Sequence, residues 1–151
     1  YVYTRPPNNL VVSIEGSIAV GKSTLLHNLA KLGYCIHPEP LNVWDHLLEP
    51  YYQDKLRYGY ELQAKILEGF VQPPKSGSGC LVERSPAGSR VFINLMDSEG
   101  NLSPRNLQAL ITTLSSVWTA DATIYLQSDA TTSLNRIQCR SQAGDNGVTS
   151  E

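Results

Sequence analysis

The sequence has few cysteines, no excess of charge and no long hydrophobic run. Its 151 residues include only three cysteines, without C-x-x-C spacing, against 12 basic and 14 acidic side chains. No apolar run reaches the roughly 20 residues of a membrane helix, so we expect no membrane span. The balanced charge argues against a general nucleic-acid binder. The isolated cysteines favour a reducing intracellular compartment, cytoplasm or mitochondrion, over a disulfide framework or a zinc site.

Short apolar runs alternate with helical patterns along the chain. This alternation predicts an α/β fold with a mainly parallel sheet flanked by helices. The chain starts at Tyr1 rather than Met and stops after a polar stretch, so we expect a single domain over 1–151 that is truncated at both ends. The expected strands are Leu10–Glu15, Tyr34–His37, Cys80–Glu83 and Ala122–Gln127. The expected helices are Lys22–Leu32, Asn42–Glu49, Lys55–Phe70, Ser103–Trp118 and Ala130–Cys139.

Residues 16–23 have the spacing G-x-x-x-x-G-K-S between a predicted strand and a predicted helix. The glycines let backbone N–H groups turn toward phosphate oxygens, and the helix N-terminus adds its positive dipole end. Lys22 would neutralise the β- and γ-phosphates of ATP, and the Ser23 hydroxyl would ligate Mg²⁺. A chance glycine-rich turn is the alternative, which the strand–loop–helix context disfavours. The predicted nucleotide-binding residues of this loop are Gly16, Ser17, Ile18, Ala19, Val20, Gly21, Lys22, Ser23 and Thr24.

P-loop proteins include switches, motors and kinases, and the sequence lacks the N-K-x-D motif that GTPases use to read their base. A motor ATPase would end a strand in an acidic pair, whereas here Glu83 is followed directly by Arg84. A carboxylate next to a cation suits a kinase, in which one group lies near the metal and the other manages the charge of the transferred phosphate. Glu15, Glu39 and Glu83 all fall at the carboxyl ends of predicted strands, where such sheets bind ligands.

Three residues outside the loop are candidates for binding an acceptor. Glu39, between two prolines, could accept a proton from a substrate hydroxyl or be an ordinary loop glutamate. Trp44 could stack on a base, although an isolated tryptophan more often packs in the core. Gln63 could pair with a nucleobase edge or lie on a helix surface. It shares one side of its predicted helix with Leu56, Tyr60, Leu67 and Phe70.

Six segments taken together are more specific than any one of these residues. They are IEGSIAVGKSTLL (14–26), PEPLNVW (38–44), LLEPYYQDKLRYGYELQ (47–63), VERSPAGSRVF (82–92), DATIYLQ (121–127) and LNRIQCRSQ (134–142). In this order the chain resembles the deoxyribonucleoside kinases, the family of mitochondrial thymidine kinase, deoxycytidine and deoxyguanosine kinases and the insect multisubstrate enzyme. The resemblance implies a P-loop NTPase-type fold, with helices on both faces of the sheet. It also implies ATP-dependent phosphorylation of a deoxyribonucleoside 5′-hydroxyl in nucleotide salvage.

The resemblance implies a catalytic group at the end of the sheet. Glu39 would be the general base for the 5′-hydroxyl, and Arg84 would hold that hydroxyl and the developing charge beside Lys22. Glu83 would organise Mg²⁺ together with Ser23.

The resemblance also implies residues that bind the nucleoside and close over ATP. Trp44 would line the base pocket, Gln63 would pair with the base edge and Tyr52 would contact the sugar 3′-hydroxyl. Arg90 would lie near the base pocket. Arg136 and Arg140 would belong to an arginine-rich lid that closes over the ATP phosphates. The family further suggests a homodimer through the helices around Leu56–Phe70 and Leu107–Trp118.

The chain also departs from the family pattern. Gln142 stands where family lids commonly carry a further arginine, and Ala143-Gly144 stands where they carry acidic residues, which predicts weaker turnover. Ser89 replaces an aspartate of the deoxycytidine and purine kinases, which favours a thymidine-like pyrimidine. The family's C-terminal helix after the lid is missing.

Two alternative functions therefore stay open. A nucleoside monophosphate kinase of the thymidylate type would share the loop, but Glu39 argues against it because that acceptor calls for an extra cation. The other is a catalytically weak nucleotide-binding member of the family with a structural role.

Overall fold

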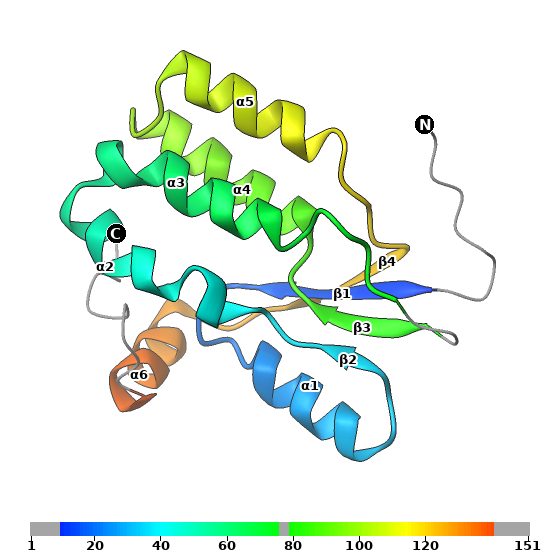
Figure 1. Cartoon of the computed structure of the whole chain (residues 1–151). Coiled ribbons are helices and arrows are strands. Elements are labelled where there is room, and N and C mark those ends of the chain that lie inside the picture. Colours follow the sequence, from blue (N-terminus) through cyan, green and yellow to red (C-terminus); the bar gives the residue numbers. More distant parts are fainter. Residues whose placement is uncertain (1–9, 76–78, 141–151) are drawn as a thin grey trace.

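The computed structural model describes residues 10–75 and 79–140. Within them, four parallel strands form one sheet in the order β2-β3-β1-β4. Helices cover both faces of this sheet (Figure 1), which confirms the predicted P-loop-type α/β arrangement. The strands are β1 (Val11–Gly16), β2 (Ile36–His37), β3 (Cys80–Glu83) and β4 (Ala122–Leu126).

The helices lie on the two faces of the sheet in separate groups (Figure 1). Helices α1 (Lys22–Lys31) and α6 (Ala130–Arg140) lie on the first face. Helices α3 (Lys55–Glu68), α4 (Pro86–Ser98) and α5 (Pro104–Leu114) lie on the second. The short helix α2 (Leu48–Gln53) and two 3₁₀ helices, η1 (Leu41–Val43) and η2 (Asp45–Leu47), connect β2 to α3 beyond the carboxyl ends of the strands. Among the described residues, none of the helices has the length and apolar character needed to cross a membrane.

The ends of two helices follow from capping side chains. Ser103 accepts a hydrogen bond from the backbone N–H of Asn106 (3.2 Å) and Pro104 begins α5, as its sequence predicts. Asp54 accepts one from the N–H of Arg57 (3.1 Å) and begins α3 in the same way. Helix α5 ends at Leu114, before the predicted end at Trp118.

Two sequence-based expectations about helices need correction. The stretch Asn42–Glu49 is not one helix but η1, η2 and the start of α2, because Trp44 adopts a φ of −137° between them while its side chain is buried. No element was predicted between Glu83 and Ser103, yet this segment forms α4. Its buried residues Ser89, Ile93 and Met96 have the i, i+4, i+7 spacing of a helix that packs along one side.

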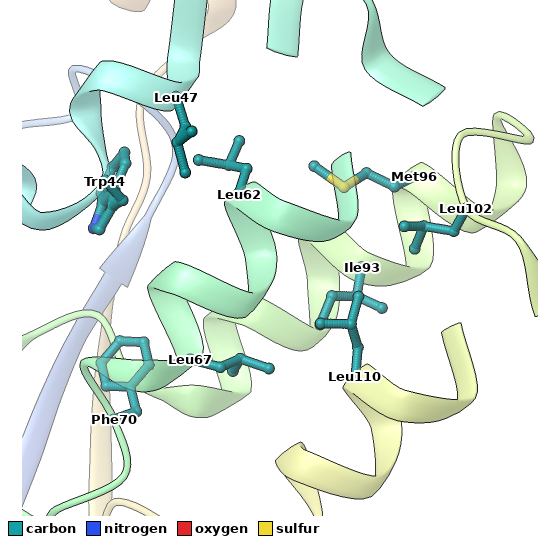
Figure 2. Packing of buried hydrophobic residues seen from close by; sticks show 9 residues of the cluster. All are labelled: Trp44, Leu47, Leu62, Leu67, Phe70, Ile93, Met96, Leu102 and Leu110. Carbon is teal, nitrogen blue, oxygen red and sulfur yellow. The ribbon is translucent and has the colours of Figure 1, made fainter. Parts of the chain in front are cut away.

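The apolar side of α3 also differs from the prediction. Leu56 is 62% exposed and Tyr60 is exposed, whereas Gly59, Leu62 and Gln63 are buried together with Leu67. A cluster of buried side chains from α3, α4, α5 and the residues before α2 forms the main core of this face (Figure 2). Its members are Trp44, Leu47, Leu62, Leu67, Phe70, Ile93, Met96, Leu102 and Leu110.

Candidate active site

The phosphate loop connects the central strand β1 to α1. Gly16 ends β1 with a φ of 145°, and a Cβ there would lie 2.4 Å from the carbonyl oxygen of Leu126 on β4. Only glycine therefore fits this close approach of two strands. Ala19 also has a positive φ of 60°, at the middle of the loop. Non-glycine residues adopt this conformation only where the surrounding structure imposes it, so the loop is held in a defined shape.

Lys22 folds back across the loop. Its Nζ donates hydrogen bonds to the carbonyl oxygens of Gly16 (3.1 Å) and Ser17 (2.8 Å), and the residue is only 6% exposed. Burial, and then the positive charge of Arg84, lower the pKa of Lys22 from 10.5 to about 8, although nearby carboxylates oppose the shift. The ammonium is thus poorly solvated and lies against the phosphate loop. When a nucleotide binds, phosphate oxygens could replace its two carbonyl partners.

Ser23 and Glu83 join α1 to the end of β3. The Ser23 hydroxyl donates to Glu83 Oε1 over 2.6 Å. A hydroxyl and a carboxylate are hard oxygen donors, and Mg²⁺ is commonly held by one or two such protein groups together with water and phosphate oxygens. This pair could therefore hold the metal that the sequence places at these two residues. Consistent with so small a protein contribution, no group of three or more His, Cys, Asp or Glu side chains suited to a metal occurs among the described residues.

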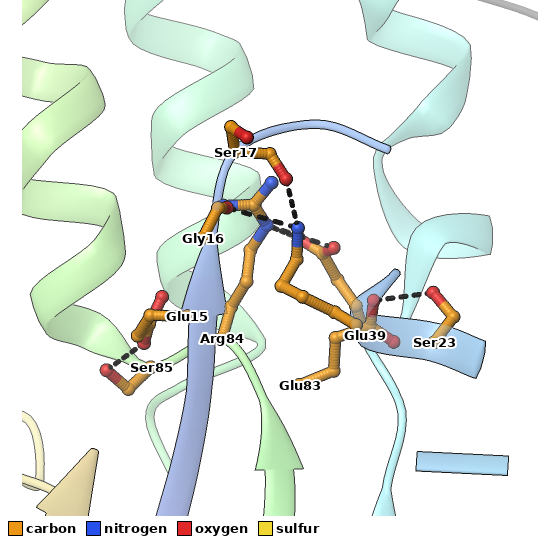
Figure 3. Close-up of polar contacts among 9 residues, drawn as sticks. Glu15, Gly16, Ser17, Ser23, Glu39, Glu83, Arg84 and Ser85 are labelled. Atoms are coloured by element: carbon orange, nitrogen blue, oxygen red, sulfur yellow. Dashed lines mark hydrogen bonds and ion pairs between the residues drawn. The ribbon is translucent and has the colours of Figure 1, made fainter. Parts of the chain in front are cut away.

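Glu39 and Arg84 form an ion pair beside the loop (Figure 3). Glu39 lies two residues after β2 and Arg84 directly after β3, so the pairing of these parallel strands brings both side chains to one edge. The Arg84 Nε is 3.1 Å from Glu39 Oε1 and 3.2 Å from Oε2, and the side chains are only 15% and 11% exposed. Burial raises the pKa of Glu39 above its ordinary value, while Arg84 opposes the rise. The result is a shielded carboxylate with a proton affinity suited to a general base.

The backbone of Arg84 is itself unusual. It has a φ of 62°, the left-handed region that non-glycine residues rarely adopt. Its guanidinium stacks over the ring of Phe92 on α4, 5.1 Å from the ring centroid. Sequence reasoning assigned no role to Phe92, because α4 was not predicted. The i, i+4, i+7 spacing of Ser89, Ile93 and Met96 is the sequence pattern that predicts this helix.

Helix α6 reaches back to the phosphate loop. Arg136 Nη1 donates to the carbonyl oxygens of Ala19 (3.3 Å) and Val20 (3.0 Å). The structure thus places one cation of the predicted lid directly on the loop. Arg140 is the last residue of α6, and its side chain, like Gln142 and Ala143-Gly144, lies outside the described residues.

The predicted nucleoside-binding residues come from the helices α2, α3 and α4 and from the segment between η1 and η2. Gln63 is 2% exposed on α3, and its Oε1 has no hydrogen-bond partner among the described residues. A buried amide oxygen without a partner is costly in a protein that binds nothing there. Trp44 is part of the buried core cluster, and Tyr52 on α2 packs its ring 5.3 Å from that of Tyr51. Ser89 is buried on α4, one turn after Ser85, whereas the adjacent Arg90 is exposed.

Comparison with known proteins identifies the family. A family model described as deoxynucleoside kinase matches residues 12–151. Protein 029R of Invertebrate iridescent virus 3 is 33% identical over 141 residues, which cover 89% of this chain and 72% of that protein. The thymidine kinase of Ictalurid herpesvirus 1 is 28% identical over 156 residues, which cover 94% of this chain and 68% of that enzyme.

A solved structure shares the fold. The deoxyadenosine kinase of M. mycoides, determined with dCMP and dCDP bound, superimposes with a TM-score of 0.79 at 22% identity, covering 93% of this chain and 75% of the other. Together with the loop, the ion pair and the Ser23–Glu83 contact at one edge of the sheet, the family match identifies this chain as a kinase, a phosphotransferase that belongs to the deoxynucleoside kinase family.

Proposed function

We propose that this kinase transfers the γ-phosphate of ATP to the 5′-hydroxyl of a deoxyribonucleoside, preferring a thymidine-like pyrimidine. The observation that carries this proposal is the Glu39–Arg84 pair, which lies beside the phosphate loop. A buried carboxylate paired with a cation suits a hydroxyl that must lose a proton while negative charge builds up on the phosphate. A phosphorylated acceptor, such as thymidylate, would bring a second negative charge toward Glu39.

The chain's own residues would then act by positioning and charge neutralisation. Glu39 accepts the proton of the 5′-hydroxyl while the hydroxyl oxygen attacks the γ-phosphorus, in line with the departing ADP. Arg84 directs that hydroxyl and offsets the charge that develops on the transferring phosphoryl group. Lys22 leaves the carbonyls of Gly16 and Ser17 to bind the β- and γ-phosphates. No covalent enzyme intermediate is required.

The metal proposed for this site is Mg²⁺, and the Ser23 and Glu83 oxygens fit it. Ser23 and Glu83 would hold Mg²⁺ when ATP is bound, and the metal would supply charge neutralisation for the phosphates. The 2.6 Å contact between Ser23 Oγ and Glu83 already holds both donors at one place. Arg136, with Arg140 on the same helix, would close over the phosphates and exclude water, so that ATP is not simply hydrolysed.

The nucleoside itself would bind on the helical side of the edge. Gln63 supports this placement, because an unpaired buried amide oxygen can accept a hydrogen bond from a base. Trp44 would line the base pocket, Tyr52 would contact the 3′-hydroxyl and Arg90 would lie near the base. Ser89, small and neutral, supports a thymidine-like base. The herpesvirus relative is a thymidine kinase and the structural neighbour a deoxyadenosine kinase, so the comparisons leave the base open.

A homodimer through α3 and α5 is the assembly we propose. Exposed Leu56, Tyr60 and Val71 lie along the outer side of α3 and just beyond its end. A groove of about 200 Å³ between α3 and α5 adds Ala109 and Thr113 to this surface. Tyr60→Glu should reduce the mass measured by light scattering, whereas Leu32→Glu, which alters an exposed leucine after α1, should not. A monomeric wild-type protein would contradict this assembly.

An ADP-release assay tests the activity directly. It compares thymidine, deoxycytidine, deoxyadenosine, deoxyguanosine and thymidylate, with Glu39→Gln as the test variant and the exposed Glu61→Gln as its control. We expect thymidine to be the best acceptor and Glu39→Gln to lose about 10²- to 10⁴-fold in kcat, the usual contribution of a general base. Activity on thymidylate alone, or an unchanged rate in Glu39→Gln, would refute the proposal.

A further inference from the structure

One carboxylate beside the phosphate loop has no part in the transfer described above. Glu15 is the residue of β1 immediately before Gly16, yet its side chain lies on the opposite side of this strand from Glu39 and Ser23 (Figure 3). There Glu15 Oε1 accepts a hydrogen bond of 2.6 Å from the hydroxyl of Ser85. Glu15 therefore contacts the residue that directly follows Arg84.

The Ser85 hydroxyl does not cap the helix that it precedes. Ser85 is the N-cap of α4, a position where a serine oxygen ordinarily accepts a backbone N–H of the first turn. Here its side chain makes no capping bond, and it donates to Glu15 although the residue is only 1% exposed. The Glu15 carboxylate instead lies beside the first turn of α4, where negative charge is favourable. Ser85 could cap α4 by itself, without Glu15. The hydrogen bond between Ser85 and Glu15 therefore needs another explanation.

A glycine leaves room for the same carboxylate. A Cβ added at Gly88 would lie 2.7 Å from Glu15 Oε2, which is closer than a Cβ atom approaches other atoms in proteins, so the carboxylate would have to move. Gly88 lies inside α4, where alanine would otherwise be favoured by about 1 kcal/mol. Among the described glycines, Gly88 is the one at which an added methyl group would displace Glu15, and here the helix carries glycine rather than the better helix former alanine.

Arg84 directly precedes Ser85. Its left-handed backbone, with a φ of 62°, persists only if the flanking residues are held on both sides. On one side, the Arg84 N–H donates to the carbonyl oxygen of Ile14 over 3.1 Å. On the other, Ser85 is tied to Glu15. Two consecutive residues of β1 thus hold the turn that directs the Arg84 guanidinium between Glu39 and Phe92.

We propose that Glu15 is a positioning residue for the phosphoryl transfer: through Ser85 it fixes the strained turn that holds Arg84 beside Glu39. This inference rests on the proposed function, because it assigns Glu15 to the machinery in which Arg84 acts. Glu15 works as a hydrogen-bond acceptor, so glutamine, whose amide oxygen can accept the same bond, preserves most of its effect.

Steady-state kinetics of three variants test this role. Glu15→Ala and Ser85→Ala should each lower kcat about 10- to 100-fold, the loss typical of a misplaced catalytic group, while the KM for ATP changes by no more than about twofold. Glu15→Gln should recover most of the lost rate. A smaller folded fraction would also lower the apparent kcat without changing KM, so each kcat is expressed per folded protein, measured from the unfolding curve of that variant. An unchanged kcat in Glu15→Ala, or a rise in the KM for ATP that accounts for the loss, would overturn the proposal.

A mutant cycle tests the contact at Gly88. Gly88→Ala should lower kcat in the wild type, because the new methyl group displaces the Glu15 carboxylate. In the Glu15→Ala background the same substitution should cost nothing in kcat and should raise the stability to urea, since alanine then improves the helix. Equal effects in both backgrounds would contradict the proposal.

A measurement independent of activity separates this inference from the proposed function. The Nε–H resonance of Arg84, assigned by its loss in Arg84→Lys, should exchange slowly with solvent while it donates to Glu39. Glu15→Ala should speed that exchange at least about tenfold, as expected if about 1.4 kcal/mol of the hydrogen bond's stabilisation is lost, and Glu15→Gln should not. Unchanged exchange would overturn the inference whatever the activity. Slow exchange in a wild-type protein that phosphorylates no nucleoside would refute the proposed function and, with it, the positioning role in transfer.

Discussion

Replacing Arg84 by methionine removes the only cation that forms an ion pair with Glu39 among the described residues, and should raise the pKa of that carboxyl. The sign follows from charge: a neighbouring cation favours the carboxylate, so its loss favours the protonated acid. Lys22 and Glu83 also face Glu39, with opposing effects. The shift therefore measures the contribution of Arg84 against a background that the substitution leaves in place.

The distances in the Glu39–Arg84 ion pair give the size of the expected change in the pKa of Glu39. Two unit charges about 4 Å apart interact by about 4 kcal/mol at an effective dielectric constant of 20. The two distances in this ion pair are 3.1 and 3.2 Å, but partial exposure and the cost of burying both charges reduce the net interaction energy. Hydrogen bonds to charged groups contribute about 1.5 to 3 kcal/mol, and one pKa unit corresponds to 1.36 kcal/mol. Arg84→Met should thus raise the pKa of Glu39 by about 1 to 2 units.

Carbon-13 NMR of labelled glutamate carboxyls measures this pKa without relying on activity. Glu39→Gln identifies the resonance, and Arg84→Lys should restore part of the shift because it keeps the charge but not the guanidinium geometry. Arg57→Met, which removes an exposed arginine that stacks on Tyr58, should leave the pKa of Glu39 unchanged. A Glu39 pKa that stays constant or falls in Arg84→Met would refute the reasoning.

Three further substitutions test the loop, the metal donors and the base pocket. The pKa of Lys22 is about 8 in the folded chain and 10.5 ordinarily, so the free energy of unfolding of the wild type should rise between pH 8 and pH 10.5. Thermal unfolding measured over the same pH range should show no such rise in Lys22→Met. Ser23→Ala should raise the Mg²⁺ concentration for half-maximal rate, with the exposed Ser98→Ala as control. Gln63→Leu should stabilise the free protein by about 1 to 3 kcal/mol, because it removes an unpaired buried oxygen, while raising the KM for the nucleoside. Lower thermal stability in Gln63→Leu, a flat pH response of the wild type or an unaltered Mg²⁺ dependence in Ser23→Ala would contradict these expectations.

The central strands β1 and β3 could be predicted because they are buried, short, apolar and rich in β-branched residues. The edge strand β4 is largely exposed, and its Thr123, Ile124 and Tyr125 favour a strand by their β propensity. The range Cys80–Glu83 was obtained to the residue. Helix α4 was missed because Pro86 and Gly88 near its start are typical of a turn, whereas tertiary packing of Ile93 and Met96 determines the helix. The prediction of one helix around Trp44 was wrong for a similar reason, because burial of the Trp44 side chain overrides the local helical pattern.

For the site, the loop residues could be predicted from spacing alone, because the chemistry requires a fixed local geometry. The partnership of Glu39 with Arg84 joins residues 45 positions apart and depends on which strands are neighbours. The left-handed turn at Arg84 leaves no trace in the sequence, because such turns are usually marked by glycine. The contact of Glu15 with Ser85 depends on that turn, so it too required the structure.

The strand order has a consequence for how the chain folds. The phosphate loop is synthesised before β3 and β4, yet its strand β1 lies between these two strands in the sheet. Ser23 meets its partner 60 residues further on, and Val20 meets Arg136 after 116. Contacts so distant in sequence form slowly, since long loops must close first. The complete site, with Glu83 and Arg136 in contact with the loop region, is therefore assembled late in folding. A ribosome-bound chain should acquire ATP binding only after β4 has emerged.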